Sequence, residues 1–153
     1  MVSAREEDYV PSDTVRIFVY GTLRKGFANH HFLEDDCEYL GEAKSVNKYS
    51  MTAREYEGRF GTKRAIPFVS KEPEVEVLGE VYEVSQNVLK LLDRLENHPY
   101  WYVREEAEFE VLEGVEEEGK SRIVKAWIYF NEVDKGEISL SSGDFASHYP
   151  RRK

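Results

Sequence analysis

Residues 16–26 of the chain read RIFVYGTLRKG, and this stretch carries the first structural signal. Its first half is β-branched and aromatic, which is typical of a buried strand, and Gly21 ends the run. After a strand that ends in a glycine and a hydroxyl residue, successive backbone N–H groups can hold a carboxylate or an oxyanion. The pattern therefore indicates a candidate binding loop made by Tyr20, Gly21, Thr22 and Leu23. The alternative is an ordinary strand-end turn in which Gly21 supplies only backbone freedom.

The rest of the chain predicts mainly strands. Weaker strand patterns occupy residues 37–43, 48–54 and 65–69, the last interrupted by Pro67. Stronger patterns occupy residues 75–84, 102–112 and 122–130. Residues 88–96 carry apolar side chains at helical spacing after a suitable N-cap at Ser85, and a second helix is predicted near residues 29–34. Strands without a regular βαβ alternation favour an α+β fold or a β-barrel with attached helices.

The composition is that of a soluble globular chain of 153 residues with a formal net charge of −9. The length suits one domain, which we expect to span residues 14–153 after a polar tail at residues 1–13. An acidic surface argues against nucleic acid as a partner. The longest unbroken apolar run, residues 126–130, is too short to cross a membrane. The single cysteine, Cys37, suits the reducing cytoplasm, which is the expected location.

Glu96 is the second candidate site residue. On a helical wheel it falls inside the apolar arc of residues 88, 89, 91, 92 and 95, whereas Lys90, Asp93 and Arg94 fall on the opposite side. A carboxylate on a buried face is costly unless it is paired or protonated, and burial raises its pKa toward the range useful to a general base. The alternative is that Glu96 ends the helix and rotates outward to bond a loop group.

The other reactive side chains form weaker patterns. The four histidines lack metal-ligand spacing, Cys37 has no nucleophile signature, and no G-x-S-x-G elbow is present. Residues 105–118 hold eight glutamates without a lysine or arginine, which indicates a solvated face, with cation binding as the alternative. Trp127 and Tyr129 share a strand face, where a core layer is favoured over a pocket wall. Residues 139–153 are expected to form a surface tail, with closure of Tyr149 over a substrate as the alternative.

The two candidate sites occur together in a pattern that resembles the γ-glutamylcyclotransferase-like superfamily. The most similar branch is that of γ-glutamylamine cyclotransferase and the avirulence-induced proteins. The match begins with IFVYGTLRKG at residues 17–26 and Asn29-His30. It continues with GEVYEV at residues 79–84, LLDRLE at residues 91–96, Pro99 and YVR at residues 102–104. AWIY at residues 126–129 resembles the late strand of the family, so the resemblance covers roughly residues 15–131.

The resemblance implies a small mixed β-barrel flanked by helices, with Glu96 as catalytic acid and base and a substrate-binding loop at Tyr20, Gly21, Thr22 and Leu23. The family reaction is an intramolecular aminolysis of a γ-glutamyl amine or small γ-glutamyl peptide, which releases 5-oxoproline and a free amine. The tethered amine is its own nucleophile, and no metal or cofactor is implied. Two alternatives stay open: a non-catalytic small-molecule or partner-binding domain on the same scaffold, and another amide-cleaving acyl-transfer enzyme. The charged segment 56–64 lies where members of the family build variable pocket walls, which leaves the identity of the leaving amine open.

Overall fold

The computed structural model describes residues 14–112, 122–149 and 151. The predicted polar tail at residues 1–13 and the turn predicted near residues 114–119 lie outside them. The strands are β1 (Thr14–Val19), β2 (Cys37–Glu57), β3 (Lys63–Ser85), β4 (Val103–Val111), β5 (Arg122–Phe130) and β6 (Ile138–Ser139). The helices are α2 (Gln86–Leu95) and the short α3 (Phe145–His148), with 3-10 turns η1 (His30–Leu33) and η2 (Arg59–Gly61). No helix in this part of the chain is long and apolar enough to span a membrane.

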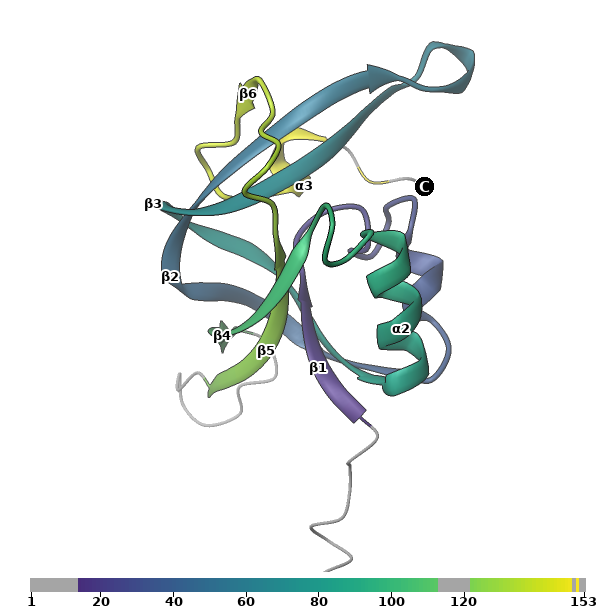
Figure 1. Cartoon of the computed structure of the whole chain (residues 1–153), viewed down its shortest axis with the longest axis vertical. Helices are drawn as coiled ribbons and strands as arrows, with labels where there is room; N and C mark the ends of the chain where they lie inside the picture. The colour runs from purple at the N-terminus through teal and green to yellow at the C-terminus, as the bar shows by residue number, and fades with distance from the viewer. Residues whose placement is uncertain (1–13, 113–121, 150, 152–153) are drawn as a thin grey trace, which may run out of the picture.

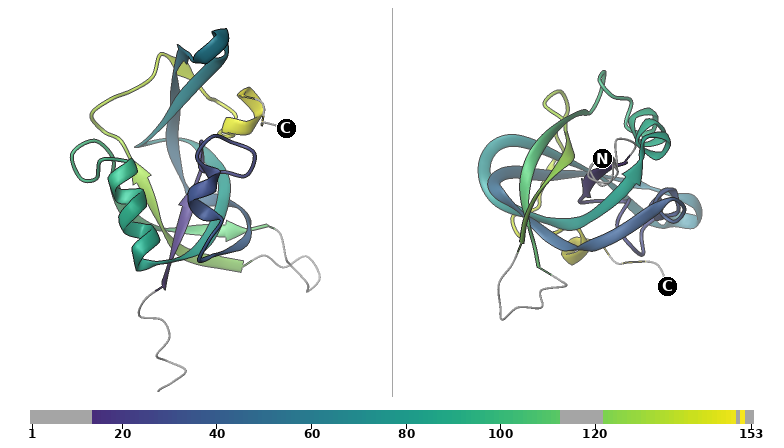
Figure 2. Two further views of the ribbon diagram at one scale, coloured as in Figure 1. Left: turned by 90° about the vertical axis from the view of Figure 1, so that its right-hand side faces the viewer. Right: turned by 90° about the horizontal axis from the view of Figure 1, so that it is seen from below.

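The strands form one mixed sheet that closes on itself (Figure 1, Figure 2). Its order is β3-β1-β5-β4-β2-β6, and β2 also pairs with β3, so the strands from β3 round to β2 make a ring. The β1–β5 pair is parallel, and the other pairs are antiparallel. Helix α2 packs outside the ring beside β1 and β3 (Figure 2). The predicted α+β class, with a small mixed strand-rich architecture and few helices, is confirmed.

Strand β1 is buried on both faces because its side chains alternate between two apolar clusters. Phe18 belongs to the cluster enclosed by the ring, where it stacks on Phe109 with 4.1 Å between the ring centroids. Ile17 and Val19 belong to the second cluster, together with Leu92 of α2. None of these five side chains is more than 3% exposed. The apolar run that opens the sequence pattern is therefore a strand between two layers of the core.

Two pairs of predicted strands are single strands in the structure. Residues 37–43 and 48–54 both belong to β2, which continues through shifts of register against β3. Residues 65–69 and 75–84 both belong to β3. Pro67 does not interrupt β3, because its carbonyl faces away from β2 and accepts a hydrogen bond of 2.6 Å from the Tyr102 hydroxyl. Its missing N–H would point the same way, so no ladder bond is lost.

The predicted helices are present with shifted ends. The Ser85 hydroxyl accepts a hydrogen bond of 3.1 Å from the Val88 N–H and caps α2, as predicted. The helix predicted near residues 29–34 is the 3-10 turn η1. In β4, Phe109 and Val111 are buried on one face near the end of the strand. At the other end of that face Glu105 is exposed and pairs with Lys71 at 2.6 Å.

The expected surface tail at residues 139–153 is wrong for the part that the structure describes. Leu140, Phe145 and Tyr149 are all buried in the cluster inside the ring, with at most 8% of each side chain exposed. The Tyr149 hydroxyl also donates a hydrogen bond of 2.8 Å to Glu55 of β2. These apolar residues stand four or five positions apart without a regular period, so no sequence pattern marks the segment as part of the core.

Candidate active site

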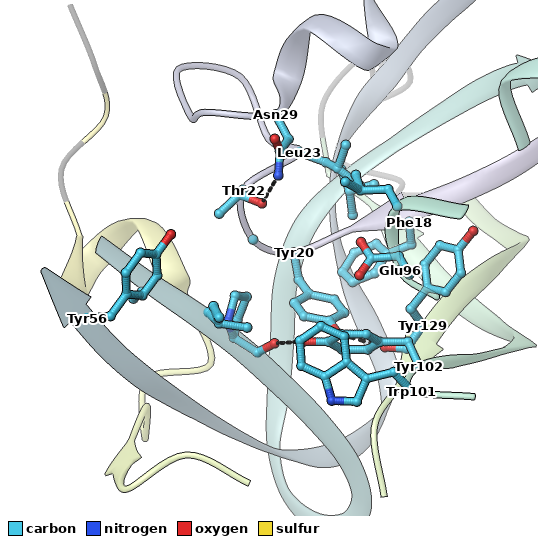
Figure 3. A pocket seen from close by; sticks show the side chains of 16 residues that line it. Phe18, Tyr20, Thr22, Leu23, Asn29, Tyr56, Glu96, Trp101, Tyr102 and Tyr129 are labelled. Atoms are coloured by element: carbon cyan, nitrogen blue, oxygen red, sulfur yellow. Dashed lines mark hydrogen bonds between the residues drawn. The ribbon is translucent and has the colours of Figure 1, made fainter. Parts of the chain in front are cut away.

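A cavity of about 180 Å³ opens between the end of β1, the end of α2 and the β2–β3 hairpin (Figure 3). One water molecule needs only about 15 Å³ by the same measure, so the cavity admits a small organic group. The structure brings together every predicted site residue, with Glu96 on one wall and the loop of Tyr20, Gly21, Thr22 and Leu23 on another. The remaining walls are formed by Phe18, Val19, Asn29, Tyr56, Ala65, Ile66, Pro67, Leu95, Trp101, Tyr102 and Tyr129.

Gly21 is required by a close approach of another strand. A Cβ atom at position 21 would lie 2.4 Å from Cγ of Pro67, which is closer than two carbon atoms can approach. Backbone bonds hold the loop in place: the Arg24 N–H donates to the Gly21 carbonyl at 3.0 Å, and the Asn29 N–H donates to the Thr22 carbonyl at 2.9 Å. The Asn29 side chain also donates to the Thr22 hydroxyl at 2.9 Å. The loop is therefore fixed at the edge of the cavity.

A buried group of charges anchors the same loop from behind. Arg24 is 4% exposed, donates to Asp144 at 2.8 Å and has its Nε 3.6 Å from Oε2 of Glu80. Glu80 is 2% exposed and accepts hydrogen bonds from the Lys25 N–H and the Tyr82 hydroxyl. Burial acts to raise the pKa of Asp144, but the hydrogen bonds from Arg24 and Ser147 and the charge of Arg24 together hold that pKa below its usual value. Sequence reasoning missed this anchor because Arg24 and Asp144 lie 120 positions apart.

Helix α2 ends at Leu95, and Glu96, the last residue of the helical pattern in the sequence, is its C-cap. The end is a Schellman motif, in which the Asn97 N–H donates to the Arg94 carbonyl and the His98 N–H donates to the Asp93 carbonyl. Asn97 takes the left-handed φ of 54° that this motif requires. The turn fixes the backbone of Glu96 so that its carboxyl group points into the cavity (Figure 3). The alternative, an outward-rotated Glu96, is wrong.

Asp93, which the helical wheel places opposite the apolar arc, forms a paired group with Arg104 of β4. Arg104 donates to both carboxyl oxygens of Asp93, at 2.8 and 3.1 Å, and the Tyr129 hydroxyl donates to Asp93 at 2.7 Å. Burial acts to raise the pKa of Asp93, but the hydrogen bonds from Arg104 and Tyr129 hold it below its usual value. The group ties the end of α2 to β4 and β5. A helical wheel cannot reveal it, because the polar partners come from other elements.

The Glu96 carboxyl group lies among apolar and aromatic side chains, and no cation among the described residues pairs with it. Burial raises its pKa from 4.5 to about 7. The neighbouring hydroxyl groups are engaged elsewhere: those of Tyr20 and Tyr102 donate to backbone carbonyls at 2.6 Å, and that of Tyr129 donates to Asp93. Near neutral pH the Glu96 carboxyl group is therefore present in both protonation states and can accept or release a proton.

The weaker candidates lie outside this chemistry. Burial raises the pKa of the Cys37 thiol to about 11, which disfavours the reactive thiolate, and Cys37 does not line the cavity. His30 places its Nδ1 3.0 Å from the Leu23 carbonyl and so supports the loop. Within the described ranges, no three histidine, cysteine or acidic side chains gather as they would around a metal ion. Tyr129 fits both interpretations of its strand face, a core layer and a pocket wall, because it is buried in the core and also lines the cavity.

Sequence reasoning missed the aromatic walls of the cavity. Trp101 and Tyr102 follow the turn after α2, and the indole N–H of Trp101 donates to Asp134 at 2.7 Å, which fixes the ring. Tyr56 comes from the β2–β3 hairpin and stands across the cavity from Glu96 (Figure 3). The aromatic run at residues 100–102 was an available signal, because it directly follows the helix that carries Glu96. Tyr56 opens the segment 56–64, where the family resemblance implies variable pocket walls, but the position of its ring depends on the pairing of two long strands.

A fixed loop and a buried carboxyl group with a pKa near neutrality thus face one small aromatic cavity. The model of the family described as gamma-glutamyl cyclotransferase, AIG2-like, matches residues 17–147. The chain therefore belongs to this family, and the resemblance read from its motifs is confirmed.

Individual relatives agree with the family. A Methanocaldococcus jannaschii protein, provisionally named a gamma-glutamylcyclotransferase, is 34% identical over 133 residues, which cover 86% of this chain and 96% of that protein. Gamma-glutamylaminecyclotransferase C of Danio rerio is 38% identical over 118 residues, 76% of this chain and 74% of that protein. A mouse AIG2-like protein shares the fold, with a TM-score of 0.70 and 24% identity over 92% of this chain and 96% of that one. An uncharacterized Pyrococcus horikoshii protein has a TM-score of 0.60 and 26% identity, covering 88% and 92%.

Proposed function

We propose that the chain is a γ-glutamylcyclotransferase that converts a γ-glutamyl amine or a small γ-glutamyl peptide into 5-oxoproline and a free amine. Glu96 is the general acid and base in this proposal. The observation that carries it is a buried carboxyl group with a pKa of about 7 in the same small cavity as the loop that ends β1. The names of the archaeal and zebrafish relatives point to the same chemistry.

The reaction needs one group that moves a proton twice. The α-amine of the γ-glutamyl group attacks the side-chain carbonyl carbon, so a C–N bond of the five-membered lactam forms and the bond to the leaving amine breaks. The attacking amine loses a proton, and the departing amine gains one. Glu96 takes up the first proton and delivers the second, and it ends in the state in which it began. Because the nucleophile is already tethered to the carbonyl, no side-chain nucleophile is needed.

The loop supplies the electrostatic part of the proposal. The backbone N–H groups of Gly21, Thr22 and Leu23 hold the glutamyl carboxylate or the developing oxyanion. The bonds from Asn29 to Thr22 keep these donors in place before the substrate arrives, and preorganised donors need little reorganisation during the reaction. The aromatic walls limit access of water, which favours attack by the internal amine over hydrolysis. A small-molecule substrate also suits a cytoplasmic protein with a net charge of −9, which nucleic acid would repel.

The test is release of 5-oxoproline from γ-glutamyl-lysine, γ-glutamyl-alanine and glutathione by wild-type protein, Glu96→Gln and the control Glu74→Gln. Glu74 is exposed on β3 and lines none of the cavities described here. We expect product from wild type and Glu74→Gln, and a loss of at least about 100-fold in Glu96→Gln, the usual contribution of a general acid or base. Equal turnover by Glu96→Gln and wild type would show that Glu96 is not the proton carrier.

The same assay separates the two alternatives. Release of an amine without 5-oxoproline would identify a different amide-cleaving acyl-transfer enzyme. Ligand-dependent melting without any product would identify a non-catalytic binding domain on this scaffold.

A further inference from the structure

A second cavity, of about 460 Å³, adjoins the first at the β2–β3 hairpin. Thr22, Asn29, Tyr56 and Ala65 line both cavities, so they form the boundary between the two. The second cavity extends away from Glu96 toward α3, and its further walls are Phe27, Ala28, Thr62, Lys63, Arg64, Phe145 and Tyr149. In Figure 3, Tyr56 lies across the first cavity from Glu96, and Tyr56 also lines the second cavity.

The charges along the two cavities are opposite. Glu96 is the single charged residue among the described side chains that line the first cavity. The second cavity has two cations on its lining, Lys63 and Arg64, and no carboxylate. A ligand that occupies both cavities therefore meets a carboxyl group at one end and cations at the other.

Arg64 contributes more of this positive charge than Lys63. Lys63 is 69% exposed and has its Nζ 3.6 Å from the Glu55 carboxylate, so a neighbour already offsets its charge. The Arg64 side chain forms no ion pair or hydrogen bond with any residue that the structure describes, although its backbone belongs to the β2–β3 ladder. Its side chain lies across Gly58, where an added Cβ atom would come within 2.9 Å of both Cγ and Nε of Arg64. The guanidinium group therefore lies against the hairpin, and its N–H donors are available to another partner.

We propose that the second cavity binds the leaving amine of the substrate and that Arg64, with help from Lys63, is the residue that selects this amine by its carboxylate. This inference rests on the proposed function. The γ-glutamyl group occupies the first cavity between Glu96 and the Tyr20–Leu23 loop, and the scissile bond lies at the boundary near Thr22. An anionic leaving group places its charge beside the unpaired guanidinium, whereas a leaving group with only a cationic or neutral end finds no charged partner there.

The test compares γ-glutamyl-alanine with γ-glutamyl-alaninamide, which differ only in carboxylate against carboxamide. For wild type we expect kcat/KM for the carboxylate substrate to exceed that for the amide by about tenfold, the size of one charge-assisted hydrogen bond. Arg64→Gln and the double variant Arg64→Gln with Lys63→Gln should bring this ratio close to one, mainly through KM for γ-glutamyl-alanine. Arg64→Lys should recover part of the preference.

Arg59→Gln is the matched control, because Arg59 lies on the same hairpin and lines neither cavity. It should keep the wild-type ratio, so that a general change in net charge is excluded as the cause. Equal use of both substrates by wild type, or an unchanged ratio in the double variant, would overturn the inference. If the proposed function itself is wrong, neither substrate yields 5-oxoproline, so this outcome is distinct from a failure of the inference about Arg64.

Discussion

Replacing Glu96 with glutamine should make the protein more stable at alkaline pH while it removes the proton carrier. Burial raises the pKa of Glu96 from 4.5 to about 7, so the folded protein favours the protonated carboxyl group. The stabilisation from this proton is fully present below pH 4.5 and is lost as the pH rises through about 7. Glutamine has the same shape and carries no charge at any of these pH values, so the variant does not undergo the loss.

The size of the effect follows from the pKa. One pKa unit is equivalent to about 1.4 kcal/mol, so the full rise corresponds to ~3.4 kcal/mol. Of this, ~2.5 kcal/mol is lost between about pH 5 and about pH 8.5, because at about pH 5 most of the unfolded-state carboxyl groups are already ionised. For a chain of this length, one kcal/mol moves Tm by about 2–4 °C. The Tm of Glu96→Gln minus that of wild type should therefore grow by about 5–10 °C over this range.

The assay is thermal unfolding of wild type, Glu96→Gln and the exposed control Glu74→Gln, each at both pH values and at constant ionic strength. Glu74→Gln should follow wild type at both pH values. A Tm difference between Glu96→Gln and wild type that does not change with pH would refute the reasoning, since it would mean that Glu96 does not titrate in a buried setting. A variant that is less stable than wild type at alkaline pH would refute it more strongly.

Three further predictions concern the site and its supports. The kcat/KM of wild type should rise with pH through an apparent pKa of about 7, as ionised Glu96 becomes available, and a flat profile in that range would count against Glu96 as the base. Gly21→Ala should reduce kcat by at least about tenfold in the 5-oxoproline assay, because its Cβ would lie 2.4 Å from Pro67 and displace the loop. Asp144→Ala should lower the free energy of unfolding in urea by about 2 kcal/mol, because Arg24 stays buried without its hydrogen-bonded partner; an unchanged midpoint would show that Glu80 alone suffices.

The sequence was sufficient for features that depend on local order. The strand at residues 16–20 can be predicted because both of its faces are buried, so its sequence is an apolar run that ends at a glycine. The Ser85 cap and the helical spacing behind it predict α2 closely, because capping and periodicity act within a few residues. Glu96 was placed correctly toward the core even though it lies one residue beyond the helix, since the Schellman turn continues the helical direction by that one position.

Features set by distant partners could not be predicted in this way. Pro67 interrupts the strand pattern in the sequence. Only the hydrogen bond from the Tyr102 hydroxyl to the Pro67 carbonyl shows why a proline is tolerated at that position. Phe145 and Tyr149 have no periodic pattern, yet they help fill the ring. Asp93 seemed to face solvent because a wheel shows one helix alone, whereas Arg104 and Tyr129 reach it from neighbouring strands.

The placement of the charges explains how Glu96 keeps a pKa useful for proton transfer. Two buried or half-buried cations support the walls of the cavity, Arg24 behind the loop and Arg104 beside α2. A free cation near Glu96 would stabilise its ionised form and lower its pKa, which would weaken it as a base at neutral pH. Each arginine is instead paired with an aspartate on its own side, Arg24 with Asp144 and Arg104 with Asp93. The paired charges therefore hold the two walls in place without lowering the pKa of Glu96. Burial alone sets the pKa of this carboxyl group.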